Sequence, residues 1–240
     1  MDIEKVKEKL SHVEGWLSEK EGKLLYNLAK NCKGKGVIVE IGSWKGKSTI
    51  WLSYGSKEGP KSKIFAIDPH IGEIDEGKII ESSLQKFKYN ITNAGVSDIV
   101  ESIIKTSQEG VKDVKEPVEL IFIDGLHEYD YVKLDFELWF PKIINNGTIA
   151  FHDFYRFGVT RFIKKYILTS NHFRNIGFAD SILYAEKVEH NSIADRIKNK
   201  YIISLKVCLV RKILKSDLTS RVASHVPDLF KNFVKMLLGI

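Results

Sequence analysis

Apolar and polar positions along the chain alternate between two kinds of pattern. Short continuous apolar runs predict buried strands at residues 37–41, 63–67, 99–104, 120–123 and 148–151. Apolar residues at helical spacing predict helices at residues 2–30, 48–54, 76–94, 131–140 and 161–168. Strands without a polar face that alternate with helices are typical of a doubly wound, mostly parallel α/β sheet covered on both sides.

The two ends of the chain add to this plan. Residues 173–178 and 181–186 predict an antiparallel hairpin that closes the sheet, and Ser18 with Glu21 forms a capping box in the first helical segment. Residues 193–214 and 227–240 predict a helical C-terminal extension, whose last helix is strongly amphipathic. We therefore expect an N-terminal helical cap at 1–36, a central domain at 37–186 and a basic tail at 187–240.

Composition narrows the class of protein. The chain has 240 residues, 43% of them hydrophobic, and only two cysteines, which favours a globular protein in a reducing, cytoplasmic compartment. Its charged start lacks the apolar region of a signal peptide, and no apolar run approaches the ~18 residues of a spanning helix.

The net charge of +6 is unevenly distributed. Residues 187–240 hold 11 Lys and Arg against 4 Asp and Glu, a net charge of +7, whereas residues 1–186 hold 26 against 27, a net charge of −1. Because the body is nearly neutral, the charge gives no support to nucleic-acid binding by the whole chain.

The first predicted strand runs into a glycine loop, VEIGSWKGKST at residues 39–49. A phosphate-binding P-loop needs four residues between its glycines, whereas Gly42 and Gly46 enclose three, and Glu40 would direct a carboxylate toward the phosphate. A dinucleotide-binding G-x-G-x-x-G is absent because position 44 is Trp. A P-loop-like module that binds nucleoside triphosphates stays an alternative, favoured by the lysine and serine that follow Gly46.

An acid at the end of this strand, followed by a glycine turn, suits a ligand that carries positive charge and no phosphate. S-adenosylmethionine is such a ligand. Gly42 would let the backbone approach its amino-acid end, and the helix that begins near residues 47–49 would receive its carboxylate. Asp68, at the end of the second strand, would accept the ribose hydroxyls. The alternative is that Glu40 and Asp68 only cap turns.

Three segments carry a family resemblance: EIGSWKGKST at 40–49, IDGLHEY at 123–129 and GTIAFHD at 147–153. Together they resemble class I SAM-dependent methyltransferases, and more narrowly the group with sugar and macrolide O-methyltransferases and cephalosporin-hydroxylase-like proteins. The resemblance covers about residues 14–186 and implies a seven-stranded sheet with a reversed last strand. Many methyltransferases carry Gly where this chain has Trp44, which the narrower group tolerates. The implied cofactor-binding residues are Glu40, Gly42, Ser43, Trp44, Ser48, Asp68, Ser107, Gln108 and Asp124.

The ends of the fourth and fifth strands supply the candidate catalytic residues. Catechol-type O-methyltransferases carry an Asp at the fourth strand end, a Lys three residues later, and an Asp-Asn pair at the fifth, and they bind Mg²⁺ through these acids. By resemblance, Asp124 matches the first Asp, His127 falls at the Lys position, and His152-Asp153 falls at the pair. We expect these four side chains to converge opposite the sulfonium.

Methyl transfer to oxygen requires alignment and the removal of a hydroxyl proton. His127 is the expected general base because imidazole titrates near neutral pH, with His152 and Asp124 as further catalytic residues. There are two alternatives: His127 is only a loop histidine that is hydrogen-bonded to the backbone, or His152 is the general base. Mg²⁺ or another divalent metal would use Asp124 and Asp153, although His152 in place of a carboxylate favours a softer ion.

The sequence thus predicts a SAM-dependent methyltransferase that O-methylates a small hydroxylated acceptor such as a sugar or glycoside, with N-methylation left open. Trp16, and a wall of Phe154, Tyr155 and Phe157, would either contact the acceptor or fill the core. The tail would dock on the domain, join a homo-oligomer, or lie at a membrane surface as a peripheral anchor. A non-catalytic methyltransferase-fold scaffold that acts through the tail is the remaining alternative.

Overall fold

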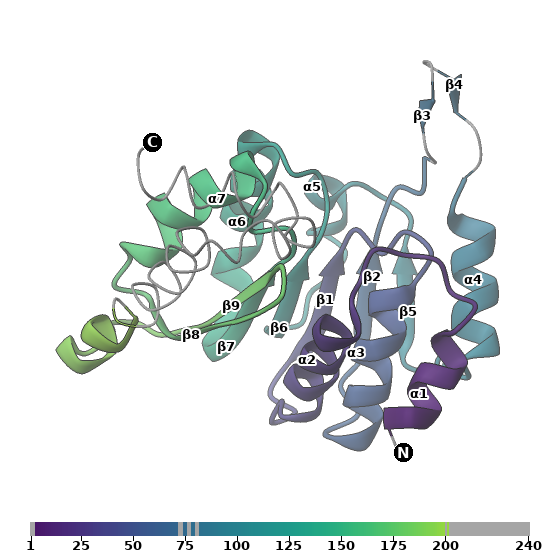
Figure 1. Ribbon diagram of the computed structural model, residues 1–240, viewed down its shortest axis with the longest axis horizontal. Helices are drawn as coiled ribbons and strands as arrows, with labels where there is room; N and C mark the ends of the chain where they lie inside the picture. The colour runs from purple at the N-terminus through teal and green to yellow at the C-terminus, as the bar shows by residue number, and fades with distance from the viewer. Residues whose placement is uncertain (1–2, 72–73, 76–77, 80–81, 200, 202–240) are drawn as a thin grey trace, which may run out of the picture.

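The computed structural model describes residues 3–71, 74–75, 78–79, 82–199 and 201 (Figure 1). Residues 193–199 and 201 are helical, as predicted, but residues 200 and 202–214 of this predicted helix and the whole of helix 227–240 lie outside the described residues. Among the described residues, no helix has the length and apolar character needed to cross a membrane.

A seven-stranded sheet forms the centre of the molecule, in the order β5-β2-β1-β6-β7-β9-β8. Its first five strands are parallel, and β9 pairs antiparallel with both β7 and β8. The doubly wound sheet and the closing hairpin are therefore confirmed. The strands are β1 (Val37–Ile41), β2 (Ile64–Ile67), β5 (Val100–Ile103), β6 (Val118–Ile123), β7 (Ile143–Phe151), β8 (Phe173–Ala179) and β9 (Ile182–Lys187).

The three central strands, β1, β2 and β6, are buried along their whole length, which explains their continuous apolar runs, whereas the edge strand β5 is partly exposed. In β1, Ile38 packs in a core with α2 (Glu19–Lys30), α3 (Lys47–Glu58) and α4 (Leu84–Asn93). Val39 and Ile41 point the other way, into a core with α6 (Tyr129–Trp139) and α7 (Phe157–Ile163). The crossover helices thus leave the carboxyl ends of the strands as the edge at which polar side chains gather.

The prediction of a single continuous helix at 2–30 is wrong. It is two helices, α1 (Ile3–Leu10) and α2, separated by residues 11–18. The capping box explains the break: the side chain of Ser18 accepts from the Glu21 backbone N–H, and the Glu21 side chain accepts from the Ser18 backbone N–H. A capping box satisfies the free N–H groups at a helix start, so a helix begins at this point rather than running through it.

The predicted helix at 76–94 is also wrong in its first part. α4 begins at Leu84, and the chain before it forms a two-stranded antiparallel hairpin, β3 (Ile74–Asp75) with β4 (Lys78–Ile79). The sequence between these strands includes a glycine, which is a poor helix former. The predicted helix at 161–168 starts earlier, as α7, and ends in a π-helical turn at Lys164–Leu168.

Candidate active site

The loop between β1 and α3 is held against the end of β6. Gly42 has φ +84°, and a Cβ atom at this position would lie 2.2 Å from the carbonyl oxygen of Asp124. A glycine is therefore required for both its conformation and its lack of a side chain. This contact brings the end of β1, with its predicted cofactor residues, next to the end of β6, with its predicted catalytic residues.

Glu40 lies completely buried at the carboxyl end of β1. The hydroxyl of Thr49, in the first turn of α3, donates a hydrogen bond to Oε2, whereas Oε1 has no hydrogen-bond partner among the described residues. Burial raises the pKa of Glu40 to about 8; the hydroxyls of Ser48 and Thr49 offset this in part, and the negative charges of Asp124 and Asp68 add to it. Glu40 is thus a buried acid that lacks a counter-charge.

The same loop leaves a second polar atom without a partner. The hydroxyl of Ser43 is buried and has no hydrogen-bond partner among the residues the structure describes, and Ser48 is buried at the start of α3. Buried polar atoms are nearly always paired, so two unpaired ones in one loop indicate a place for a ligand with donors. The ammonium of S-adenosylmethionine fits this requirement.

Asp68 follows β2 and faces the same loop. Its Oδ2 accepts from the Trp44 backbone N–H at 2.8 Å, and its Oδ1 accepts from the His70 backbone N–H at 2.7 Å. Each carboxylate oxygen has a second lone pair, so the orientation is fixed while two acceptor sites stay available. This geometry suits a ribose with two hydroxyl donors.

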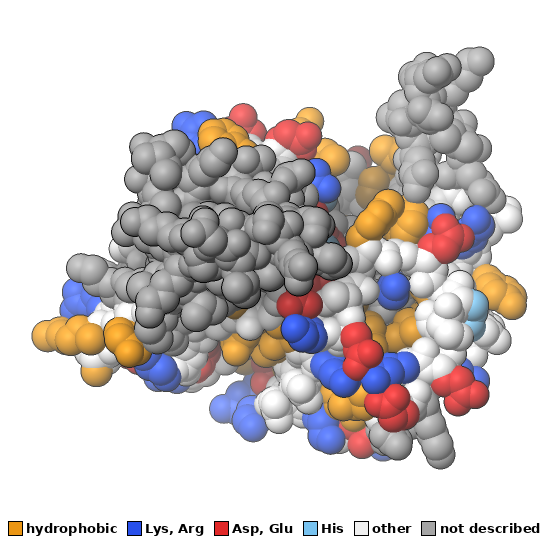
Figure 2. All heavy atoms as spheres, viewed as in Figure 1, with side chains coloured by type: hydrophobic (Ala, Val, Ile, Leu, Met, Phe, Trp, Pro, Cys, Tyr) orange, Lys and Arg blue, Asp and Glu red, His pale blue; other side chains and the backbone are white. Residues whose placement is uncertain are grey.

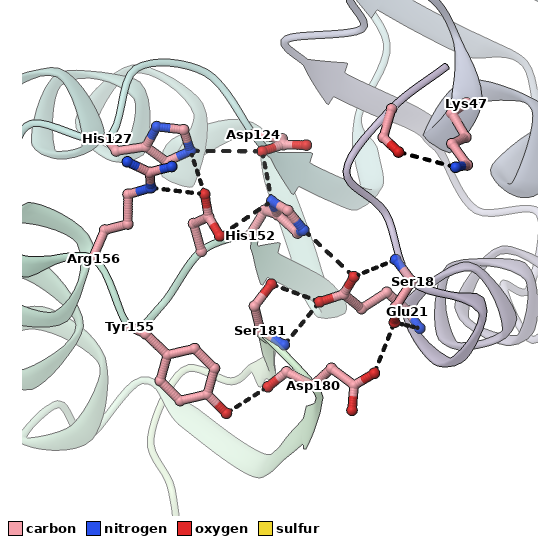
Figure 3. A network of polar contacts seen from close by, with 12 residues as sticks. Ser18, Glu21, Lys47, Asp124, His127, His152, Tyr155, Arg156, Asp180 and Ser181 are labelled. Carbon is pink, nitrogen blue, oxygen red and sulfur yellow. Dashed lines mark hydrogen bonds and ion pairs between the residues drawn. The ribbon is translucent and has the colours of Figure 1, made fainter. Parts of the chain in front are cut away.

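Trp44 contributes its backbone to Asp68 and its side chain to the surface of the loop. Its indole stacks on that of Trp16, with ring centroids 4.6 Å apart, and Lys45 Nζ lies 4.1 Å from the Trp44 ring centroid. Trp16 is 79% exposed, which excludes the alternative in which it fills the core. A salt bridge between Lys45 and Glu14, at 2.7 Å, holds the two loops together. So does a hydrogen bond from Lys47 Nζ to the carbonyl of Gly15, at 3.0 Å (Figure 3).

Two of the predicted cofactor-binding residues, Ser107 and Gln108, lie after β5, where the family resemblance implies that they flank the adenine. Ser107 begins α5 (Ser107–Gly110), and its hydroxyl accepts a hydrogen bond from Trp139 Nε1 at 2.9 Å. Gln108 is exposed. These positions are at the same edge of the sheet as Asp68, and their contact with adenine stays a prediction.

The four predicted catalytic side chains do converge (Figure 3). His152 Nδ1 lies 3.0 Å from Asp124 Oδ1, and His127 Nε2 lies 3.2 Å from Asp153 Oδ2 and 3.9 Å from Asp124 Oδ1. Asp153 also pairs with Arg156, whose Nε donates at 3.0 Å. His127 and Asp124 are partly exposed, whereas His152 is buried.

Glu21 completes this network, and the sequence analysis missed it. It is buried in the first turn of α2, with Oε2 at 3.6 Å from His152 Nε2. Its Oε1 accepts from the backbone N–H of Ser181 at 2.8 Å and from the Ser181 hydroxyl at 2.6 Å. One carboxylate therefore joins the N-terminal cap, the end of β7 and the β8–β9 turn. The capping box identified Glu21 but accounted for only one of its oxygens.

The charges of His152 and of the carboxylates around it determine one another's protonation states. Burial alone would lower the pKa of His152, but the carboxylates of Asp124, Glu21 and Asp153 outweigh it and raise that pKa to about 10. Burial would raise the pKa of Glu21, but His152, Ser181 and Ser18 outweigh it and hold that pKa at about 2. His152 is therefore an imidazolium at neutral pH, which disfavours the alternative in which it is the general base.

The predicted aromatic wall does not form as a unit. Phe154 is fully buried in the core beside α7, Tyr155 donates its hydroxyl to the carbonyl of Asp180 at 2.7 Å, and Phe157 is exposed. Of these three residues, Phe157 alone presents an exposed aromatic surface.

The donor set fits Mg²⁺ poorly. One ligand atom each from Asp124, His127 and His152 lies within 4.8 Å of the others. Two of the three are imidazole nitrogens, whereas Mg²⁺ prefers oxygen ligands. His152 holds a proton at neutral pH between carboxylates, and Asp153 is engaged by Arg156 and His127. The Asp124–Asp153 metal site stays a prediction.

Comparison with known proteins agrees with this geometry. Residues 39–154 match the family model described as a methyltransferase domain. A catechol O-methyltransferase of Mycobacterium tuberculosis is 25% identical over 138 residues, which are 57% of this chain and 56% of that protein. An uncharacterized protein of Sinorhizobium fredii is 30% identical over 119 residues, or 48% of this chain and 13% of that protein. The chain thus spans less than two thirds of the length of either curated relative.

Solved structures share the fold. The O-methyltransferase TomG from Streptomyces achromogenes, in complex with SAM, matches with a TM-score of 0.56 at 18% identity, over 78% of this chain and 89% of that one. An O-methyltransferase from Bacillus cereus, in complex with SAH, matches with a TM-score of 0.55 at 20% identity, over 77% and 90%. With the sheet order and the match over residues 39–154, these findings show that the chain has the fold of the class I SAM-dependent methyltransferases.

Proposed function

We propose that this protein transfers a methyl group from S-adenosylmethionine to a hydroxyl oxygen of a small acceptor. The observation that carries the proposal is Glu40: a fully buried acid with an unpaired Oε1, in a loop whose Ser43 hydroxyl is also unpaired. A buried carboxylate without a counter-charge is costly, and a ligand ammonium would remove that cost. The cofactor, when bound, supplies an electrophilic methyl group on a sulfonium.

The residues of the chain would bind the cofactor and remove the proton of the acceptor hydroxyl. Glu40 and Ser43 would bind the amino-acid end of the cofactor, and Asp68 its ribose hydroxyls. His127, which is partly exposed and lies 3.2 Å from Asp153, would take the hydroxyl proton of the acceptor. The acceptor oxygen forms its bond to the methyl carbon as the methyl–sulfur bond breaks. Asp153 stabilises the imidazolium that His127 becomes.

His152 and Asp124 act by charge and orientation in this scheme. His152 is already protonated and is held between Asp124 and Glu21, so it has no lone pair with which to take a proton. It fixes the Asp124 carboxylate, whose pKa is lowered because the nearby imidazoles of His152 and His127 outweigh the effect of burial. Asp124 is then an anionic acceptor, available to hold the acceptor hydroxyl near His127.

The acceptor class we favour is a sugar or glycoside. The exposed indole of Trp16 stacks on the partly buried indole of Trp44 in the cofactor loop, and aromatic faces pack well against the C–H face of a pyranose ring. The P-loop alternative loses its main support, because Lys47 is bonded to the carbonyl of Gly15 rather than free to meet a phosphate.

Calorimetric titration of the full chain with S-adenosylhomocysteine and with ATP tests the cofactor. We expect binding of the first and none of the second; the reverse result would refute the proposal. Methyl transfer from labelled S-adenosylmethionine is then screened on glycosides, catechols and amines. We expect His127→Ala to lose at least ~100-fold in rate while its affinity for S-adenosylhomocysteine is unchanged.

Two controls complete the design. Lys133→Ala removes a partly exposed cation on α6 that pairs with Glu137 and with none of the candidate site residues, and should leave the rate unchanged. Chelation followed by addition of Mg²⁺, Mn²⁺ or Zn²⁺ tests metal assistance. An unchanged rate after chelation is expected from the donor set, and a rate that Mg²⁺ restores would show that Asp124 and Asp153 hold a metal.

A further inference from the structure

The last described helix lies beyond the methyltransferase sheet, at one end of the molecule, where Figure 1 shows it in yellow-green. It covers residues 193–199, with Tyr201 also helical. Ser192 caps it, since its hydroxyl accepts from the Asp195 backbone N–H at 3.0 Å and the Asp195 carboxylate accepts from the Ser192 backbone N–H at 3.0 Å. The helix therefore has a defined start and a fixed rotation.

One face of this helix is anchored to the sheet. Asn191, just before it, and Asn199, within it, are both buried, and both side-chain amides donate to the carbonyl of Phe173 at the start of β8, at 2.8 and 3.1 Å. Successive helical residues turn by ~100°, so the opposite face is centred near Ile197, about 200° from Asn199.

That opposite face is apolar and exposed. Ile193, Ile197 and Tyr201 follow one another at intervals of four residues and are 70%, 65% and 62% exposed. Figure 2 shows hydrophobic side chains uncovered at this end of the molecule. We call Ile193, Ile197 and Tyr201 the tail stripe. Three large apolar side chains in one row are unusual on a solvated helix and indicate a surface that another body covers.

Cationic side chains border the stripe on both sides. At ~100° per residue, Arg196 lies on one flank and Lys198 on the other, and both are exposed. The sequence continues the pattern: residues 187–240 carry a net charge of +7 on a body of −1. The combination of an apolar row and flanking cations is the pattern of a helix that lies in a membrane interface.

We propose that the tail stripe and its flanking cations dock on the surface of an anionic membrane. A second copy of the chain fits less well. A two-fold contact through this helix would bring the same cations of both copies together, and three side chains supply much less than the ~800 Å² per partner of a stable interface. Anionic headgroups satisfy the cations while the acyl boundary receives the apolar row. This contact does not depend on the methyl-transfer chemistry.

Flotation of the full chain with vesicles tests the proposal. Vesicles of phosphatidylcholine alone are compared with vesicles that also contain phosphatidylglycerol, at low and high salt. The variant Ile193→Asp/Ile197→Asp changes the stripe. The matched control, Tyr89→Asp/Tyr131→Asp, adds the same charge at two side chains of similar exposure on α4 and α6. Arg196→Gln/Lys198→Gln keeps the stripe and removes the flanking charge.

We expect the wild-type chain and the Tyr89/Tyr131 control to float with anionic vesicles, more weakly at high salt. The Ile193/Ile197 variant should lose at least ~10-fold in partition, since each buried aliphatic side chain contributes ~1.5–3 kcal/mol, and the charge variant should lose a smaller factor. Equal flotation of the wild-type chain and the Ile193/Ile197 variant would refute the proposal. So would no flotation of the wild-type chain, or a dimer in light scattering that Ile193→Asp/Ile197→Asp dissolves without any vesicle binding. Circular dichroism confirms that the exposed substitutions leave the fold intact.

Discussion

Glu21 and Glu40 are the same residue type, both are nearly or wholly buried, and their pKa values are shifted in opposite directions. Glu21 accepts three hydrogen bonds and faces the His152 imidazolium, and its pKa is about 2. Glu40 has a hydrogen bond from Thr49 on Oε2, no hydrogen-bond partner on Oε1, and two carboxylates nearby; the hydroxyls of Ser48 and Thr49 offset burial only in part, and its pKa is about 8. Burial is common to both, so the difference comes from their partners.

This contrast indicates that Glu21 is a structural acid and that Glu40 is an acid that binds a ligand. Every partner of Glu21 belongs to the chain itself, which joins α2, β7 and the β8–β9 turn into one body around the candidate catalytic residues. Glu40 lacks such a partner in a position where the fold could have supplied one. A native protein retains an unpaired buried acid at a cost in stability, which is typical of functional sites.

The largest expected effect is on cofactor affinity. Glu40→Gln should weaken S-adenosylhomocysteine binding at least ~100-fold, about 3 kcal/mol, because a buried ammonium would lose its counter-charge. Calorimetry at pH 7 should also show release of about one proton on binding to the wild-type chain, since Glu40 is mostly protonated before it meets the ammonium. The variant should release none.

Glu119→Gln is the matched control for that measurement. Glu119 is also buried, but it lies near the opposite end of the sheet, where it accepts hydrogen bonds from the backbone N–H groups of Lys33 and Lys35. The affinity of the Glu119→Gln variant for S-adenosylhomocysteine should equal that of the wild-type chain. If Glu40→Gln binds equally well, Glu40 is not a ligand-binding acid and the comparison with Glu21 fails.

The next effect is on stability. Glu21→Ala should destabilise the fold by about 3 kcal/mol, because it leaves the His152 charge and the Ser181 donors without their partner. Urea unfolding measures this. The folded pKa of Glu21, about 2, is below the ordinary value of 4.5, so its contribution is present above pH 4.5 and is lost as the pH falls toward 2.

The difference in unfolding free energy between the wild-type chain and Glu21→Gln should therefore shrink over that acid range. Glu137→Gln, an exposed acid paired with Lys133 on α6, is the control and should change stability by less than 1 kcal/mol. A loss for Glu21→Gln that does not vary between pH 4.5 and 2 would show that packing, not charge, gives Glu21 its role.

A smaller effect of the opposite sign is expected from Glu40. Its folded pKa of about 8 lies above 4.5, so it opposes folding increasingly as the pH rises from 4.5 through 8. Without ligand, Glu40→Gln should be more stable than the wild-type chain at pH 8 and equal to it near pH 4. Thermal unfolding at both pH values measures this, and a destabilised variant at pH 8 would mean that the carboxylate has an internal counter-charge.

The same contrast explains what the sequence could predict. The parallel sheet, the hairpin and the clustering of Asp124, His127 and His152 follow from local patterns, since apolar runs mark the strands and parallel strands end at one edge. The role of Glu21 does not follow from them. Its main partners, Ser181 and His152, are far away along the chain, and only the folded structure brings α2 to that edge.

The two helix errors have the same origin. Apolar spacing suggested helices through residues 11–18 and 76–83, but a short-range signal opposed it in each case: the capping box at Ser18, and the glycine before β4. Periodicity predicts that a segment can be helical, while caps and glycines decide where the helix begins.

The smallest expected effects come from a matched pair that removes one hydroxyl from each acid. Ser181→Ala takes one donor from Glu21, but the Ser181 backbone N–H still donates at 2.8 Å, so we expect a loss of about 1 kcal/mol in stability and no change in S-adenosylhomocysteine affinity. Thr49→Val takes the hydrogen-bonded donor of Glu40, which should raise the pKa of that acid further and weaken cofactor binding by less than ~10-fold, because the carboxylate must ionise at greater cost. Unfolding and calorimetry on both variants should therefore distinguish the two acids. Ser181→Ala should change the free energy of unfolding alone, and Thr49→Val should change the affinity for S-adenosylhomocysteine. If Ser181→Ala also weakens the cofactor, the two acids belong to one coupled network, and the distinction between a structural acid and a ligand-binding acid no longer holds.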